Sequence, residues 1–85
     1  MAEIIMYTTA ICPYCTAAKQ FLARKGHTTI TEIRVDERPE LREEMMQRTQ
    51  RRTVPQIYVN GTHVGGHDDM VALDRAGKLD ALLAG

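Results

Sequence analysis

The two cysteines of the chain, Cys12 and Cys15, stand three positions apart. So close a pair, with no other cysteine present, is typical of redox catalysis or metal binding rather than of a structural disulfide framework. Pro13 suits the first turn of a helix, because its missing N–H would have no partner there. Cys12 would then cap the helix, and its sulfur could accept the N–H groups of Tyr14 and Cys15.

A sulfur at a helix start is expected to be a reactive thiolate. The unpaired amides and the positive end of the helix dipole favour the charged form, so we expect a lowered pKa for Cys12. Cys15 lies one turn further along and is expected to be more buried. From there it can attack a mixed disulfide on Cys12 and release the product. The spacing thus predicts thiol–disulfide exchange with Cys12 as nucleophile and Cys15 as resolving cysteine.

Two other interpretations of the cysteine pair are a static disulfide and half of a zinc site. A zinc site needs four ligands. His63 and His67 could complete a set with Cys12 and Cys15, but the 47 residues between Cys15 and His63 match no compact zinc finger. We therefore expect no metal and interpret both histidines as surface residues near turns.

Strand-like and helix-like patterns alternate along the chain, which predicts an α/β protein. Asn60-Gly61 is a strong signal for a type I′ hairpin turn. The expected elements are a strand at 3–8, a helix from Pro13 to a glycine cap at Gly26, a strand at 28–36, a helix opened by Pro39, strands at 56–59 and 62–64, a helix with Asp68 and Asp69 in its first turn that ends at Gly77, and a final helix holding Leu79, Leu82 and Leu83.

The order βαβαββαα is that of the thioredoxin fold, with a four-stranded mixed sheet flanked by helices. The first βαβ unit should place two strands in parallel through a right-handed crossover. No linker, repeat or low-complexity segment divides residues 1–85, so we expect a single domain.

The charge balance and hydropathy exclude several classes of protein. Lys and Arg together number 11, as do Asp and Glu, giving a formal net charge of zero. That balance argues against a nucleic-acid partner, which requires a basic face. No apolar run approaches the ~18–20 residues of a membrane span, and no secretory signal pattern opens the chain. We expect a cytoplasmic monomer.

Two further segments could bind a ligand. Gly65 and Gly66 precede a helix start, whose free N–H groups suit an anion, while Asp68 or Asp69 could take a cation, so an α-amino acid head would fit there. A capped helix start with acidic residues that favour the dipole is an equally good interpretation. The Arg51-Arg52 pair is either a solvated loop or a clamp for a substrate carboxylate.

The chain resembles the glutaredoxins from end to end. Cys-Pro-Tyr-Cys at 12–15 is the motif of the small dithiol members, Thr53-Val54-Pro55 is similar to the cis-proline segment of the family, and Gly65-Gly66-x-Asp68-Asp69 resembles its γ-glutamyl-binding corner. Each motif is weak alone, but the three in order and at family-like spacing are specific.

The resemblance implies a glutathione-dependent oxidoreductase with glutathione as reducing co-substrate and no tightly bound cofactor. Cys12 would form the mixed disulfide with glutathione, and Cys15 would resolve protein disulfides. Clients would be disulfide-containing or glutathionylated proteins, with ribonucleotide reductase as one family-level candidate. The implied glutathione contacts are Tyr14 beside the glutathionyl group, the Val54 backbone and a cis Pro55 at the cysteinyl part, Arg51 and Thr53 near the glycyl carboxylate, and Gly66, His67, Asp68 and Asp69 at the γ-glutamyl end.

Thr9 departs from the family pattern, because many glutaredoxins have a lysine three residues before the first cysteine. Without that charge, stabilisation of the thiolate must depend on the helix end and the Arg51-Arg52 loop. Two rival functions are a redoxin reduced by thioredoxin reductase and an iron–sulfur carrier bridging two subunits. The glycine–aspartate corner argues against the first, and Pro13 against the second, since glutaredoxins that hold clusters usually have a smaller residue there.

Overall fold

The computed structural model describes residues 2–85, which form a four-stranded sheet with helices on both faces. The chain alternates strand and helix before it closes with a hairpin and two helices. The elements are β1 (Ile4–Thr8), α1 (Pro13–Arg24), β2 (Thr31–Arg34), α2 (Pro39–Thr49), β3 (Gln56–Val59), β4 (Thr62–Gly65), α3 (His67–Arg75) and α4 (Leu79–Ala84).

The sheet has the strand order β2-β1-β3-β4. β1 pairs in parallel with β2 and antiparallel with β3, and β3 pairs antiparallel with β4. The hairpin between β3 and β4 turns at Asn60 and Gly61, whose φ angles of 50° and 84° are both positive, as a type I′ turn requires. This topology confirms the predicted thioredoxin fold.

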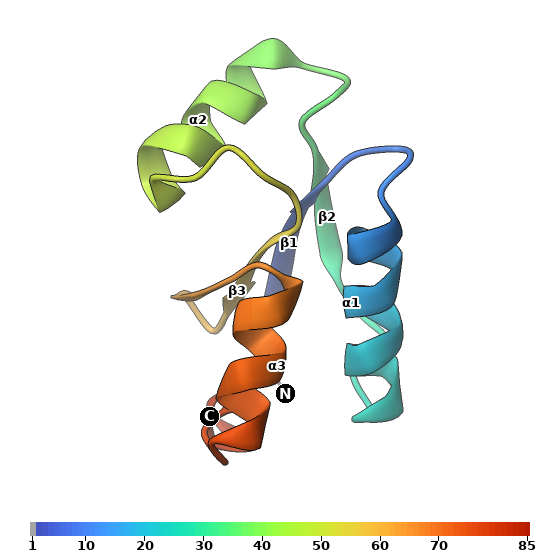
Figure 1. The fold of residues 1–85 in the computed structure, drawn as a ribbon, viewed down its shortest axis with the longest axis vertical. Coiled ribbons are helices and arrows are strands. Elements are labelled where there is room, and N and C mark those ends of the chain that lie inside the picture. The colour runs from blue at the N-terminus through green and yellow to red at the C-terminus, as the bar shows by residue number, and fades with distance from the viewer. Residues whose placement is uncertain (1) are drawn as a thin grey trace.

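The two faces of the sheet carry separate clusters of buried side chains. On one face, Met6 and Ile57 pack with residues of α1, α3 and α4, including Leu22 and Met70. On the other face, Tyr7 and Tyr58 pack with Met45 of α2 and with Val35. Figure 1 shows α1 and α3 running beside each other, with α2 set apart from both. The alternation of side chains along each strand therefore divides the core into two layers.

The predicted element boundaries differ from the structure mainly at β2. The sequence predicts a strand at 28–36, but only Thr31–Arg34 is a strand, because these four residues lie opposite Ile5–Thr8 of β1. β4 extends one residue beyond the prediction, to Gly65. Helix α1 ends as predicted near Gly26, which has a φ of 90° that a residue with a side chain rarely adopts. No helix among residues 2–85 is long and apolar enough to cross a membrane.

Leu22 joins α1 to the sheet, and its side chain is fully buried. We expect Leu22→Ala to lower the free energy of unfolding by about 2–5 kcal/mol, since it removes buried apolar contacts and leaves a cavity. Leu82→Ala serves as the matched control, because Leu82 is only half-buried at the edge of the same cluster. Urea unfolding followed by circular dichroism measures both changes. Equal losses in the two variants would contradict this account of the core.

Candidate active site

Cys12 lies where the loop after β1 meets the first turn of α1. Its backbone is extended (φ −149°, ψ 96°), and Pro13 begins the helix as predicted. The Cys12 sulfur accepts a hydrogen bond of 3.1 Å from the backbone N–H of Cys15. Of the two amides expected to reach the sulfur, that of Cys15 is the one that caps the helix. The sulfur therefore sits at the positive end of the α1 dipole.

The two cysteines are joined by a disulfide and differ in exposure. Cys12 is half-buried, whereas the Cys15 side chain is 2% exposed. Ile11 and Tyr14 flank the pair and are the large apolar side chains most open to solvent, at 92% and 63% exposed. Cys12 is therefore open to an incoming disulfide, whereas Cys15 is enclosed.

A carboxylate at the end of β2 holds the loop that leads to Cys12. Asp36 Oδ2 accepts the N–H of Ala10 at 3.1 Å, and both Asp36 oxygens accept from the Arg34 guanidinium at 2.7 Å. The Arg34 hydrogen bonds, more than that from Ala10, hold the pKa of Asp36 well below its usual range. The loop is thereby fixed to β2 through a charged group that the sequence patterns did not reveal.

The Thr53–Pro55 segment faces the sulfur of Cys12. The Val54–Pro55 peptide bond is cis, as the family resemblance implies. The carbonyl oxygen of Val54 lies 3.8 Å from Cys12 Sγ. Residues 42 positions apart in sequence therefore meet at the redox pair.

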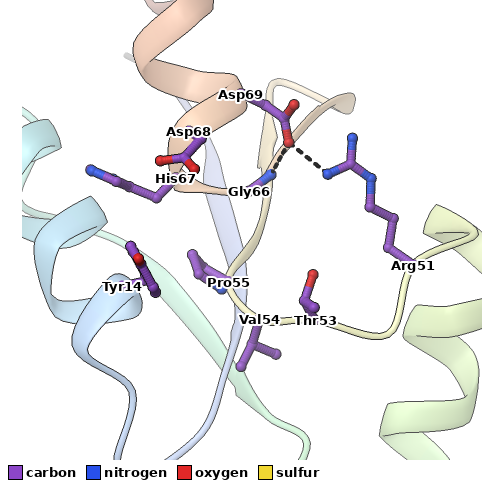
Figure 2. Close-up of a pocket in the computed structure, with 9 residues that line it drawn as sticks. All are labelled: Tyr14, Arg51, Thr53, Val54, Pro55, Gly66, His67, Asp68 and Asp69. Atoms are coloured by element: carbon purple, nitrogen blue, oxygen red, sulfur yellow. Dashed lines mark hydrogen bonds and ion pairs between the residues drawn. The ribbon is translucent and has the colours of Figure 1, made fainter.

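A pocket of about 460 Å³ opens beside this contact. Its walls come from the start of α1, the loop between α2 and β3, and the start of α3, and Figure 2 shows these segments around one hollow. The structure brings all nine residues of the predicted glutathione site together around this pocket. They are Tyr14, Arg51, Thr53, Val54, Pro55, Gly66, His67, Asp68 and Asp69.

The Asp69 carboxylate bridges two walls of the pocket. Its Oδ2 accepts the N–H of Gly66 at 2.8 Å and Nη1 of Arg51 at 2.6 Å, as the dashed lines in Figure 2 show. The Arg51 bond, followed by the Gly66 bond, lowers the pKa of Asp69. Asp69 is therefore occupied within the protein, while the exposed carboxylate of Asp68 points to the opposite side from Arg51 (Figure 2). Arg51 takes part in this bridge through Nη1.

The interpretation as a surface residue near a turn is confirmed for His63, which is exposed two residues after the Asn60–Gly61 turn, whereas His67 is half-buried. His67 packs against Tyr14 and Phe21, with ring centroids 6.3 Å apart in each case, and its Nδ1 is buried. His63 lies on β4, where its ring stacks on Tyr58 with a centroid distance of 5.1 Å. No group of three or more His, Cys, Asp or Glu side chains within residues 2–85 is placed to hold a metal ion.

Sequence reasoning missed Gln56, the residue that follows the cis proline. The sequence pattern predicts it only as the first residue of a strand. In the structure its side chain is fully buried and bonds to both Thr53 and His63. The available signal was a glutamine at the head of an otherwise apolar strand, since a buried amide needs hydrogen-bond partners.

These features define a dithiol redox centre on a thioredoxin fold. The family model for glutaredoxins matches residues 4–64. The chain is 56% identical over 84 residues to a glutaredoxin of Pseudomonas aeruginosa, with 99% of each chain covered. It is 47% identical to glutaredoxin 3 of Escherichia coli K12, covering 98% of this chain and 99% of the relative.

Solved structures agree with these relatives. The glutaredoxin of Brucella melitensis is 52% identical, with a TM-score of 0.83 over 98% of this chain and 89% of that one. A buckwheat glutaredoxin in complex with glutathione is 27% identical, with a TM-score of 0.89 over 98% of this chain and 77% of that one. The chain belongs to the glutaredoxin family and is a thiol–disulfide oxidoreductase.

Gly65 can carry no side chain without disturbing the Asp69 bridge. Its φ is 113°, and a Cβ there would lie 2.6 Å from Asp69 Oδ2 and 2.9 Å from Asp69 Cβ. We expect Gly65→Ala to lower the free energy of unfolding by about 1–3 kcal/mol. Gly66→Ala is the control, because the nearest atoms to its Cβ would be 3.5 Å away. Urea unfolding compares them, and a stable Gly65→Ala protein would contradict the close packing.

The lowered pKa of Asp69 predicts a loss of stability in acid. The unfolded carboxyl takes up a proton near pH 4, whereas the folded one does so only at lower pH. The stabilisation is therefore complete above about pH 4 and is lost as the pH falls through the folded pKa. We expect unfolding midpoints measured from pH 7 to 3 to fall less steeply in Asp69→Asn than in wild type. Asp68→Asn, outside the bridge, should follow the wild-type slope, and identical slopes in all three proteins would refute the assignment.

Proposed function

We propose that this chain reduces protein disulfides and glutathione mixed disulfides, with glutathione as its electron donor. The observation that carries the proposal is the pocket beside Cys12, whose wall includes the Val54 backbone 3.8 Å from the sulfur. A tripeptide disulfide-bonded to Cys12 would extend from that sulfur directly into the pocket. The complex of buckwheat glutaredoxin with glutathione, on the same fold, supports this ligand.

The charges around the pocket suit the two ends of glutathione. The γ-glutamyl end carries a carboxylate and an ammonium group, which fit the amides at the start of α3 and the carboxylate of Asp68. The Gly66 amide already donates to Asp69, so the amides of His67 and Asp68 would donate to the ligand. Arg51 uses one nitrogen on Asp69 and keeps further N–H donors for the glycyl carboxylate beside Thr53.

The remaining contacts would hold the middle of the tripeptide. Tyr14, exposed at the start of α1, lies beside the path of the glutathionyl group. The backbone of Val54, next to the cis Pro55, would pair with the cysteinyl residue in the manner of strand addition.

The chemistry is a sequence of thiolate–disulfide exchanges. The Cys12 thiolate attacks the glutathionyl sulfur of a mixed disulfide, forming Cys12–S–S–glutathione and expelling the client thiolate. A second glutathione thiolate then attacks that disulfide, which yields oxidised glutathione and regenerates Cys12. With a protein disulfide, the Cys12 thiolate attacks first and forms a mixed disulfide with the client. The Cys15 thiolate then attacks Cys12 and displaces the client thiolate. Two glutathione molecules then reduce the Cys12–Cys15 disulfide that results.

Clients would be glutathionylated or disulfide-containing proteins, with ribonucleotide reductase among the family-level candidates. The exposed apolar side chains of Ile11 and Tyr14 give such a protein a surface to contact beside Cys12. We place the reaction in the cytoplasm, where reduced glutathione is available, and expect a monomer to carry it out.

Single-cysteine variants test the proposal and separate the two sulfurs. In an assay coupled to glutathione and glutathione reductase, we expect Cys12→Ser to abolish turnover of every substrate. Cys15→Ser should retain turnover of a small glutathione mixed disulfide but lose reduction of protein disulfides, because it lacks only the resolving thiol. Wild-type protein without Cys12-dependent turnover in this assay would overturn the proposal.

Replacing the reductant identifies the physiological donor. The same protein-disulfide substrate is offered with either the glutathione system or thioredoxin reductase and NADPH. Turnover with the flavoenzyme alone would favour the rival redoxin function.

A further inference from the structure

Gln56 is a fully buried polar side chain that the exchange reaction does not use. It is the first residue of β3, and it faces the same side of the sheet as Tyr58 because side chains two apart on a strand share a face. Its Nε2 donates to the Thr53 carbonyl oxygen at 3.1 Å and lies 3.4 Å from Thr53 Oγ1. Both contacts reach back across the cis proline to a residue that lines the pocket.

The Thr53 carbonyl and the Val54 N–H belong to one peptide unit. In residues 2–85 the cis bond is Val54–Pro55, so the Thr53–Val54 bond is trans. In a planar trans peptide the C=O and N–H groups point in opposite directions. By holding the Thr53 carbonyl toward the inside of the protein, Gln56 turns the Val54 N–H outward. Val54 lines the pocket, and its N–H makes no hydrogen bond within the described chain.

His63 fixes which end of the Gln56 amide faces Thr53. His63 Nε2 lies 2.8 Å from Gln56 Oε1, an oxygen that can only accept, so Nε2 carries the hydrogen. A flipped amide would place two donors together at His63 and two acceptors together at Thr53. The His63 ring packs against the Tyr58 ring. The Arg48 guanidinium also lies over Tyr58, 4.7 Å from the centroid of its ring.

We infer that Gln56 and His63 are positioning residues that aim the Val54 N–H at the substrate backbone. The inference rests on the proposed glutathione function, since it assigns the groups that orient one contact of that site. Neither residue lines the pocket, and their side-chain hydrogen bonds are made to Thr53 and to each other. Their substitution should therefore weaken binding of the tripeptide without changing the exchange step at the sulfur.

Binding of S-methylglutathione, which cannot undergo exchange, tests the inference apart from chemistry. Amide NMR titration of the reduced protein follows the Val54 resonance and gives Kd. We expect Gln56→Leu to raise Kd about fivefold to tenfold, as the loss of one oriented hydrogen bond predicts. Gln56→Glu should raise it at least as much, because its carboxylate still accepts from His63 but repels the Thr53 carbonyl.

His63→Leu should also raise Kd, and His63→Gln, which keeps an N–H donor, should restore much of the affinity. The matched control is Gln47→Leu, the same substitution at an exposed site on α2, which should bind as wild type does. In the coupled assay, Gln56→Leu should raise KM for a small glutathione mixed disulfide by the same factor and leave kcat unchanged. A merely structural role would instead lower the fraction of active protein, and hence kcat.

The outcomes separate the inference from the proposed function. Wild-type protein that neither binds S-methylglutathione nor turns over with glutathione would refute the proposed function itself. If wild type binds and Gln56→Leu or Gln56→Glu binds equally well, only the positioning role is wrong. The positioning role is also wrong if Gln47→Leu weakens S-methylglutathione binding as much as Gln56→Leu does. A fall in kcat at constant KM in Gln56→Leu would overturn it as well.

Discussion

The amide of Cys15 donates a hydrogen bond to the sulfur of Cys12. This bond forms because only a short loop separates the end of β1 from the first turn of α1. Burial of Met6 on β1 and Leu22 on α1 fixes the helix against the sheet. The helix start cannot move without breaking that packing. One sulfur is therefore held at the positive end of a helix and within reach of solvent, while the other is enclosed behind it.

The pocket depends on a different kind of constraint, because its walls come from segments far apart in sequence. The Asp69 carboxylate ties the loop after α2 to the turn before α3 through Arg51 and Gly66. Gly65 allows the carboxylate to approach, since any side chain there would collide with it. Gln56, the first residue of β3, holds Thr53 at the far end of the loop after α2. Polar bonds between loops thus join the segments that form the pocket.

Most of the fold could be predicted from local pattern. Proline at helix starts, glycine at Gly26 and the Asn60-Gly61 turn each specify backbone geometry through their own chemistry, and the structure has all of them. The extent of β2 could not be predicted, because it depends on how much of β1 lies opposite.

The candidate site was predictable as a set of residues but not as a set of contacts. The resemblance to glutaredoxins implied all nine residues that line the pocket. It could not show that Asp69 and Arg51 engage each other, nor that His63 bonds to Gln56, because these pairs form only after distant segments fold together.

The outer strands of the sheet bear on how a second polypeptide can attach. β2 is only four residues long and carries Glu32 and Arg34, each in an ion pair. β4 is equally short, and its pairing with β3 is irregular between Ile57 and Tyr58. Short, charged or irregular borders discourage intermolecular strand addition and the aggregation that follows from it. The Val54 N–H, which makes no hydrogen bond within residues 2–85, belongs to the loop before the inner strand β3, and the carbonyl of the same residue faces Cys12.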